Sequence, residues 1–533
     1  MVRDEIKHAV STTLREMFPG ITIPDFSVEV SESAEHGDYA TNAAFLLAKL
    51  AKKAPMEIAQ FLVPQLMVDP FERVVASPPG FLNFWLTEEA FQKELKEIIK
   101  KNNKYGMGKK IQEKINLEFV SANPTGLLTL GNGRGGFYGD TLANVLEFAG
   151  FNVTREYYVN DGKVSTQIKE LGKTGLGEGV TYLTPELKKV VKKLKKKIDA
   201  LKKKQPKNIR GEAGYFIAQE IHKQNKIFLQ KKAKINFNVF FSEERLYQKN
   251  DVDKLLALLK KKKLVYEKEG ATWFESKKFG DSEDRVLVRS SGEPAYFLPD
   301  LAYHLNKFFA RKFNRAIDIW GADHHGYAQR LSGALTALEV PAGKLKIIIT
   351  QLVRLIRNGV EVKMSKRKGE FVTLEEVIDE VGVDAARFFF LMYSPDSHMD
   401  FDLELAKERS VKNPVYYVQY AHARIISIFK KAKKQKLGVA DFSLLKEKEE
   451  VSLIKKLIQF PEAAEDAARD YQVMRLTRYA MELARSFHNF YEKNRVITED
   501  KNLTATRLQL VKATQIVLQN VLALLGISAP EKM

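Results

Sequence analysis

Residues 117–161, LEFVSANPTGLLTLGNGRGGFYGDTLANVLEFAGFNVTREYYVND, decide the fold of this 533-residue chain. Apolar residues alternate with polar ones from Ile115 to Val120, which predicts a strand with one polar edge. A glycine-rich loop follows, from Ser121 to Gly136, and apolar residues then recur at helical spacing up to Ala149. Residues 152–159 predict a second strand. The stretch is therefore a strand–loop–helix–strand unit with a glycine-rich first turn.

A glycine-rich turn before a helix suits phosphate binding. Glycine lets the backbone approach a phosphate, and the start of a helix presents unpaired N–H groups and a partial positive charge. The spacing fits neither GxxxxGK[ST] nor a clean GxGxxG, so neither a P-loop nor a dinucleotide fingerprint is predicted. Judged by the glycines alone, a tight turn with no ligand is an equally good interpretation.

The residues of the loop favour the ligand-binding interpretation. Thr129-Leu130-Gly131-Asn132 resembles the His-x-Gly-His signature of class I aminoacyl-tRNA synthetases. The flanking residues resemble the arginine-specific family in particular, at Glu118, Phe119, Ser121, Asn123, Pro124, Tyr158, Asn160 and Asp161. Both signature histidines, which in the family bind ATP and stabilise charge on the reacting phosphate, are replaced here. Thr129 and Asn132 still donate hydrogen bonds but carry no positive charge, and tryptophan-specific class I enzymes commonly have Thr-Ile-Gly-Asn at this place.

Length and composition predict a soluble, cytoplasmic protein of about three domains. The chain is 44% hydrophobic and 29% charged, and it contains no cysteine, which fits a reducing compartment. No run of ~18 apolar residues is present, and the N-terminus lacks the apolar core of a signal peptide. The formal net charge of +19 favours a polyanionic partner, although a basic proteome would give the same balance.

The resemblance implies a multidomain α/β and all-α fold. Residues 1–108 resemble the small α+β domain with which the family contacts the tRNA elbow. Residues 109–402 are expected to form a Rossmann-like catalytic domain with an insertion at about 165–283. Residues 403–533 lack strand signals and predict a helical bundle that resembles the anticodon-binding domain. Aromatic residues in that bundle are core by default, and some are candidates to stack on unpaired anticodon bases: Tyr416, Tyr417 and Tyr420.

The densest charge run in the chain lies between Thr184 and Lys207. Its apolar residues keep helical spacing, which predicts an amphipathic helix. A solvated helix face is the favoured interpretation of its lysines, and a ridge facing tRNA is the alternative.

An arginine pocket is predicted around Tyr296 and Asp300, at the start of a helix. A guanidinium group needs a carboxylate partner and a flat aromatic surface, which Tyr296, Asp300 and Glu118 would supply together. An ordinary capping aspartate beside a core tyrosine is the alternative. The family resemblance favours the pocket and adds Asp323 and His324, after a further strand, as contacts to the aminoacyl and ribose groups. Adjacent side chains at a strand end diverge, which argues against a metal site at His324 and His325.

A second signature, Lys363-Met364-Ser365-Lys366, resembles the Lys-Met-Ser-Lys loop of class I synthetases. Lysines on such a loop can meet the charge that builds up as pyrophosphate leaves. A surface patch of cations is the alternative, and it does not explain the full match to the signature.

The resemblance covers essentially the whole chain and implies an arginyl-tRNA synthetase. Such an enzyme forms arginyl-adenylate from L-arginine and MgATP and transfers arginine to the terminal 2′-hydroxyl of tRNA(Arg), activating arginine only with tRNA bound. The resemblance assigns charge stabilisation to Thr129, Gly131, Asn132, Lys363 and Lys366. ATP binding would add His324, Met364 and Ser365, and arginine would be selected by Glu118, Ser121, Asn123, Tyr296, Asp300 and Asp323. A monomer with no protein-bound metal and no membrane partner is expected. A non-catalytic tRNA-binding paralogue and an adenylate-forming ligase of other specificity are the alternatives.

Overall fold

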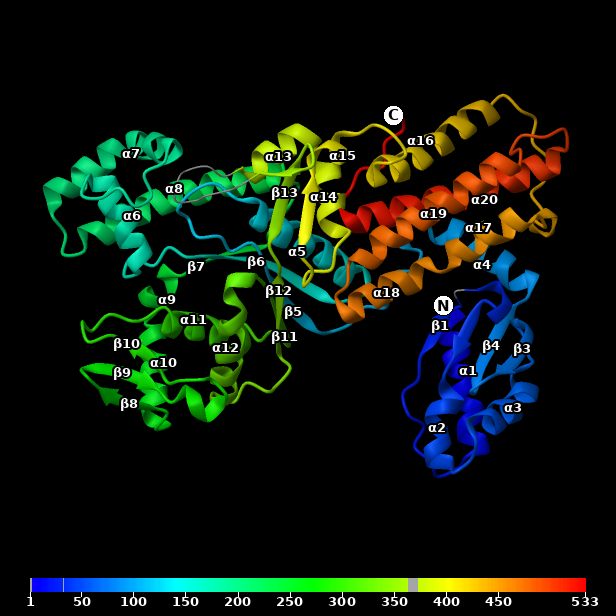
Figure 1. The fold of residues 1–533 in the computed structure, drawn as a ribbon, viewed down its shortest axis with the longest axis horizontal. Helices are drawn as coiled ribbons and strands as arrows, with labels where there is room; N and C mark the ends of the chain where they lie inside the picture. Colours follow the sequence, from blue (N-terminus) through cyan, green and yellow to red (C-terminus); the bar gives the residue numbers. More distant parts are fainter. Residues whose placement is uncertain (1, 32, 363–371) are drawn as a thin grey trace.

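A five-stranded parallel sheet forms the centre of the molecule in the computed structural model, which describes residues 2–31, 33–362 and 372–533 (Figure 1). Its strands lie in the order β12-β11-β5-β6-β7, and each neighbouring pair is parallel. The strands are β5 (Lys114–Glu118), β6 (Asn152–Val159), β7 (Val239–Ser242), β11 (Arg315–Gly321) and β12 (Leu345–Thr350). The order reverses between β5 and β11, which makes this a doubly wound sheet with its switch point at the predicted strand.

Helix α5 (Leu130–Phe148) covers one face of this sheet and is buried along nearly its whole length. Glycine makes this possible, because a Cβ at Gly139 would lie 2.6 Å from the Cβ of Phe119. Phe119 follows β5 and points toward α5, so its neighbour Glu118 points to the opposite face. That opposite face receives α11 (Phe297–Leu305) and a π-helical turn, Asn306–Ala310.

The predicted insertion, about 165–283, contains two separate pieces in the structure. The first is helical and has its own small core: α6 (Thr166–Leu176), α7 (Pro185–Lys204) and α8 (Ile209–Lys231). The chain then returns to the central sheet as the edge strand β7. The second piece packs beside the sheet: α9 (Glu244–Gln248), α10 (Asp251–Lys261), β8 (Val265–Lys268) and β9 (Ala271–Phe274). Its three-stranded sheet is completed by β10 (Arg285–Val288), just beyond the predicted end of the insertion. Sequence analysis did not predict β7, which lies inside the segment that was expected to be an insertion.

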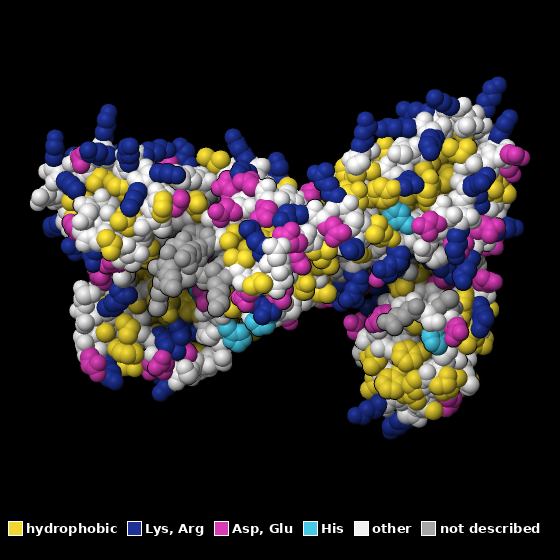
Figure 2. Space-filling view, turned by 45° about the horizontal axis from the view of Figure 1, so that its top comes forward, with side chains coloured by type: hydrophobic (Ala, Val, Ile, Leu, Met, Phe, Trp, Pro, Cys, Tyr) yellow, Lys and Arg dark blue, Asp and Glu magenta, His cyan; other side chains and the backbone are white. Residues whose placement is uncertain are grey.

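The lysine-rich segment forms α7, as its apolar spacing predicts. Its apolar side is buried against α6 and α8, and all ten of its lysines are exposed. Figure 2 shows Lys and Arg side chains gathered along the edge that these helices form. Both interpretations of the segment, a solvated face and an RNA-facing ridge, are compatible with this arrangement.

Beyond the central sheet, β12 is followed by a second, three-stranded sheet that leads into the C-terminal helices. Its order is β14-β13-β15, and helices flank it. Helix α12 (His325–Ala337) precedes β12 and packs on α11 and β12. The elements that follow β12 are β13 (Val353–Arg357), β14 (Val360–Glu361), α13 (Leu374–Val381), α14 (Val383–Leu391), β15 (Met399–Asp402) and α15 (Leu403–Lys407).

The last part of the chain is a helical bundle, in agreement with the predicted fold class. It comprises α16 (Pro414–Ala432), α17 (Lys448–Ile458), α18 (Phe460–Asp470), α19 (Met474–Lys493) and α20 (Lys501–Leu525). Among the described residues, α20 is the one helix long and apolar enough to span a bilayer, and 78% of its apolar window is buried inside the protein. That burial is typical of the core helix of a bundle.

The first part of the chain forms a separate layer against this bundle (Figure 1). An antiparallel sheet of order β1-β2-β4-β3 packs on three helices, and α4 leads from it to the bundle. The elements are α1 (Val2–Met17), β1 (Val28–Val30), β2 (Tyr39–Thr41), α2 (Ala43–Ala51), α3 (Pro55–Leu66), β3 (Phe71–Ser77), β4 (Phe81–Leu86) and α4 (Glu88–Lys101). We refer to residues 2–86 as the N-terminal module.

Candidate functional site

The carboxyl ends of β5 and β11 meet at the switch point, the place where open α/β sheets bind ligands. The glycine-rich loop leaves β5 here, and the segment with Asp323 and His324 leaves β11. The structure therefore places both predicted substrate-binding segments at one edge of the sheet.

The start of α5 is built to donate hydrogen bonds. Thr129 is its N-cap, and Asn132 Oδ1 accepts from the Thr129 backbone N–H at 2.9 Å and from its hydroxyl at 3.0 Å. Because a backbone N–H can only donate, the side-chain atom that faces it must be the oxygen of Asn132, and the amide NH2 is left as a donor. A Cβ at Gly131 would meet nothing nearer than Thr129 Oγ1, at 3.8 Å, so the helix start is open to a ligand. These features suit a phosphate group.

The turn after β5 has a strained backbone. Val120 and Ser121 have φ of 67° and 35°, a region that a β-branched residue rarely adopts. The Ser121 hydroxyl donates to Glu118 Oε1 at 2.9 Å and accepts from the Tyr158 backbone N–H at 3.0 Å, and both contacts hold the turn. Asn123 lies beyond the turn and is exposed. Strain of this kind persists where the surroundings enforce it and is concentrated at functional sites.

The predicted arginine pocket lies at the start of α11. The Tyr296 side chain is 64% exposed, its ring centroid is 5.5 Å from that of Tyr327, and its hydroxyl accepts from Arg330 at 2.9 Å. The Tyr327 hydroxyl donates to Asp300 Oδ2. An open aromatic ring beside a half-buried carboxylate is the arrangement that a guanidinium group needs.

Glu118, the third predicted member of the pocket, is buried beneath it. Its Oε2 accepts from Lys307 Nζ at 2.7 Å and from the Tyr303 hydroxyl at 2.8 Å, while its Oε1 accepts from Ser121. Burial raises the pKa of Glu118, and Lys307 acts in the opposite direction. The contacts of Glu118 in the structure are thus internal, and its direct contact with arginine stays a prediction.

Glu243 is a candidate pocket residue that sequence analysis missed. It follows β7, is buried, and has no ion-pair partner among the described residues. Burial, together with the charges of Asp161 and Asp300, raises the pKa of Glu243 to about 8. A buried carboxyl group without a cation, close to Asp300, is a ready partner for a positively charged ligand. The signal in the sequence was an acidic residue at the end of an apolar strand, but the strand itself was not recognised.

Asp323 and His324 lie at the carboxyl end of β11 in a short 3-10 turn, and both are exposed. The nearest described contacts are with each other, at 3.6 Å, and between His324 and the Trp320 ring. Their predicted contacts to the aminoacyl and ribose groups therefore stay predictions.

The second lysine signature, comprising Lys363, Met364, Ser365 and Lys366, lies outside the described residues. The described segment that follows it is attached to the start of α5. Thr373 forms an isolated bridge with Thr129, and the Leu374 N–H donates to the Leu128 carbonyl at 3.0 Å. The described residues that follow the second signature therefore contact the first signature at the start of α5.

One cluster among the described residues has the composition of a metal site, namely Glu118, His304 and Asp318. Lys307 donates to both of its carboxylates at 2.7 Å, so an ammonium group already provides the cation there. The expectation that no metal is bound by the protein stays a prediction.

Comparison with known proteins agrees with this geometry. A protein-family model described as the catalytic domain of class I (R) tRNA synthetases matches residues 94–392, which hold the central sheet and both halves of the site. The fold is therefore that of a class I aminoacyl-tRNA synthetase. Models of the arginyl-tRNA synthetase N-terminal domain and of the DALR anticodon-binding domain match residues 4–86 and 418–533.

Whole-length relatives narrow the class to one family. An arginine–tRNA ligase of Syntrophotalea carbinolica is 43% identical over 96% of both chains, and one of Listeria welshimeri is 42% identical over 99% of this chain and 98% of its own. A Campylobacter jejuni protein described as an arginyl-tRNA synthetase is 31% identical, with a TM-score of 0.73 over 84% of this chain and all of its own. The arginyl-tRNA synthetase of Thermus thermophilus has the same fold, with a TM-score of 0.81, 24% identity and full coverage of both chains. The chain belongs to the arginyl-tRNA synthetase family.

Proposed function

We propose that the chain activates L-arginine with MgATP and transfers it to the terminal 2′-hydroxyl of tRNA(Arg), releasing pyrophosphate and AMP. The observation that carries this proposal is that a helix start suited to a phosphate and a pocket suited to a guanidinium lie at one switch point. The start of α5 offers donors for a phosphate, and the pocket around Asp300 offers carboxylates for a guanidinium. These two sites lie on opposite faces of the sheet. ATP bound at one and arginine bound at the other would therefore meet at the sheet edge between them.

In this proposal the chain accelerates the reaction by positioning and charge stabilisation. Attack of the arginine carboxylate on the α-phosphate of ATP builds negative charge on phosphate oxygens. Asn132 NH2 and the open backbone at Gly131 would donate to these oxygens, and Lys363 and Lys366 would add positive charge. His324, Met364 and Ser365 complete the proposed ATP site.

Arginine selection would rest on two carboxyl groups and one aromatic ring. Asp300 and Glu243 would pair with the guanidinium, and Tyr296 would cover it. A guanidinium carries its charge at every physiological pH, so it would drive Glu243 to ionise and would pair with the half-buried Asp300, whereas a neutral analogue would supply no charge to either carboxyl group. Ser121, Asn123 and Asp323 would orient the rest of the amino acid.

A half-buried aromatic surface on α16 and α19 is the proposed site for anticodon bases. The Tyr416 and Tyr420 rings are stacked 6.1 Å apart, and His488 lies against Tyr420 at 5.9 Å. Arg424 packs over Tyr420 at 5.0 Å. Unpaired bases stack on such rings and on guanidinium planes. Partial exposure of these tyrosines supports this interpretation over a purely structural one.

Aminoacylation of tRNA(Arg) with radiolabelled arginine tests the proposal, with reactions that lack tRNA and reactions of Asp300→Asn and Lys366→Ala run beside it. We expect tRNA-dependent charging that both variants reduce. Tight tRNA binding without charging would favour the non-catalytic paralogue, and adenylate formation with another acid would favour a ligase of different specificity. Location in the cytoplasm and a monomeric state are further expectations of the proposal.

A further inference from the structure

Three acidic residues lie side by side in the central sheet, below the proposed arginine pocket. The strand registers pair Asp318 of β11 with Glu118 of β5, and Glu118 with Glu156 of β6. All three are buried, and their positions in register place them on the same face. Like charges at paired positions destabilise a sheet, and buried carboxylates are costly without partners. This row therefore needs cations.

Lys307 and Arg311, on the π-helical turn and just beyond it, supply two of them. Lys307 is fully buried, and its ammonium group bridges Glu118 and Asp318 at 2.7 Å from each. Arg311 makes a two-pronged contact with Glu156. π-Helical turns occur frequently at functional sites.

His304 connects the row to the pocket. Its Nε2 lies 2.7 Å from Asp318 Oδ2, and its Nδ1 lies 2.8 Å from the Asp300 carbonyl oxygen and 3.2 Å from Asp300 Oδ1. A carbonyl oxygen only accepts, so Nδ1 carries hydrogen. Burial opposes ionisation of Asp318, but Lys307 and His304 lower its pKa to about 2, so its oxygens also only accept and the ring is an imidazolium. Burial opposes this charge, but Asp300 and Asp318 raise the pKa of His304 to about 10.

The result is a chain of alternating charge: Asp300, His304, Asp318, Lys307 and Glu118. It begins and ends with a carboxylate. The inner end, Glu118, is buried and held by Ser121. The outer end, Asp300, has a side chain that is 23% exposed, and His304 is its one ion-pair partner among the described residues. This series of charged side chains thus has one cation fewer than it has carboxylates, and the missing cation is at the end that faces the pocket.

We propose that His304 and Lys307 are positioning residues of the arginine pocket, which hold Asp300 and Glu118 in place so that the substrate guanidinium supplies the missing cation at Asp300. This inference rests on the proposed placement of arginine at Asp300. Loss of the His304 charge would leave Asp300 and Asp318 repelling each other, and Asp300 would lose its orientation. Loss of the Lys307 charge would set Glu118 against Asp318 and disturb the strained turn at Ser121.

Steady-state aminoacylation at saturating tRNA(Arg) tests the inference, with KM for arginine, KM for ATP and kcat measured separately. The variants are His304→Gln, Lys307→Met, Lys307→Arg and, as the control for the site itself, Asp300→Asn. We expect His304→Gln to raise KM for arginine about tenfold or more, the effect of losing one charge-assisted contact. KM for ATP should stay unchanged, and Lys307→Arg should recover most of what Lys307→Met loses.

The outcomes separate the inference from the site on which it rests. If Asp300→Asn leaves KM for arginine unchanged, arginine does not bind at Asp300 and the proposed site is wrong. If Asp300→Asn raises it and His304→Gln does not, the site stands and the inference is overturned. An equal effect of His304→Gln on both KM values, together with a lower Tm, shows a structural role only and also overturns it. Because His304→Gln and Lys307→Arg are conservative changes, they remain informative if Lys307→Met fails to fold.

Discussion

Asn132 has two separable roles at the start of α5, because its oxygen caps Thr129 while its NH2 group is free to donate. The substitution Asn132→Asp would keep the capping oxygen and replace the donor with a negative charge. We therefore expect the free energy of unfolding to change by less than about 1 kcal/mol, while kcat falls by about 100-fold. Thermal unfolding and aminoacylation kinetics on the same sample check this. Unchanged kinetics would contradict a phosphate-binding role for Asn132.

Glu243 should couple arginine binding to proton release. Its pKa of about 8 means that the free protein holds the proton below this pH, and a bound guanidinium would favour the ionised form. Arginine affinity should therefore rise between pH 6 and pH 8 and then level off. Calorimetry in buffers of different ionisation enthalpy measures the released proton, and Glu243→Gln should abolish it. Proton release of the same size in that variant would assign the titration to another group.

Glu243 and the buried row show what could not be predicted at this scale. Thr129, Asn132, Tyr296 and Asp300 were found because they belong to local patterns. Asp318 and Glu118 are 200 residues apart in the chain, and only the sheet register brings them together. The proposed role of Lys307 follows from that register and from the π-helical turn that places its ammonium group between the two carboxylates.

At the scale of elements, the stretch 117–161 was predicted well because both of its periodicities are strong. The predicted strand 152–159 is β6 itself, and the helix ends at Phe148, next to the predicted end at Ala149. The first strand ends at Glu118 rather than Val120, since the backbone turns to positive φ at Val120 and Ser121. Periodicity does not report such a strained turn.

Helix α5 packs so closely on Phe119, directly after β5, that we expect no side chain to fit at position 139. A Cβ there would lie 2.4 Å from Phe119 Cγ, so Gly139→Ala should reduce the free energy of unfolding by about 1–3 kcal/mol through overpacking. It should also raise KM for arginine, because Phe119 leads directly into the strained turn. Gly179→Ala, where the nearest atom is 3.5 Å away, is the matched control. Denaturant unfolding measures the free energy of unfolding of both variants, and equal values for Gly139→Ala and Gly179→Ala would contradict the prediction.

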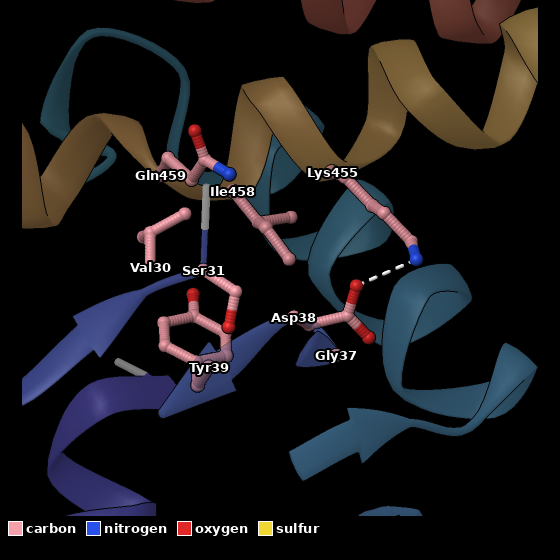
Figure 3. Close-up of a pocket in the computed structure, with 8 residues that line it drawn as sticks. All are labelled: Val30, Ser31, Gly37, Asp38, Tyr39, Lys455, Ile458 and Gln459. Atoms are coloured by element: carbon pink, nitrogen blue, oxygen red, sulfur yellow. Dashed lines mark ion pairs between the residues drawn. The ribbon is translucent and has the colours of Figure 1, made fainter. Parts of the chain in front are cut away.

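At the scale of the whole molecule, the N-terminal module docks on the helical bundle through charged side chains. Arg3 pairs with Asp466 at 2.6 Å, and Lys455 pairs with Asp38 at 2.6 Å beside a small pocket (Figure 3). Glu462 lies buried at the same interface, and burial raises its pKa to about 7.

This interface should weaken as pH rises. Because the pKa of Glu462 is higher in the docked state than in solvent, the contribution of Glu462 to docking is fully present below about pH 4.5 and is lost as pH rises through about 7. Amide hydrogen exchange in β2 should therefore become faster, relative to the intrinsic rate, between pH 5.5 and pH 8. Glu462→Gln should remove this dependence, and Lys53→Gln, whose ion pair with Glu57 lies within the module, should leave it intact. A pH dependence that persists in Glu462→Gln would contradict the assignment.

Docking of the N-terminal module on α17 and α18 also bears on how the protein is made. Arg3 meets its partners only when the ribosome has released Glu462 and Asp466, more than 450 residues later. At synthesis rates of about 5–20 residues per second, the docking surface on α17 and α18 is made on the order of half a minute or longer after the module. During that time, Arg3, Tyr39 and the rest of the docking face are exposed to solvent and to chaperones. The N-terminal module of the nascent chain must therefore remain folded, or at least unaggregated, without the surface that later covers it.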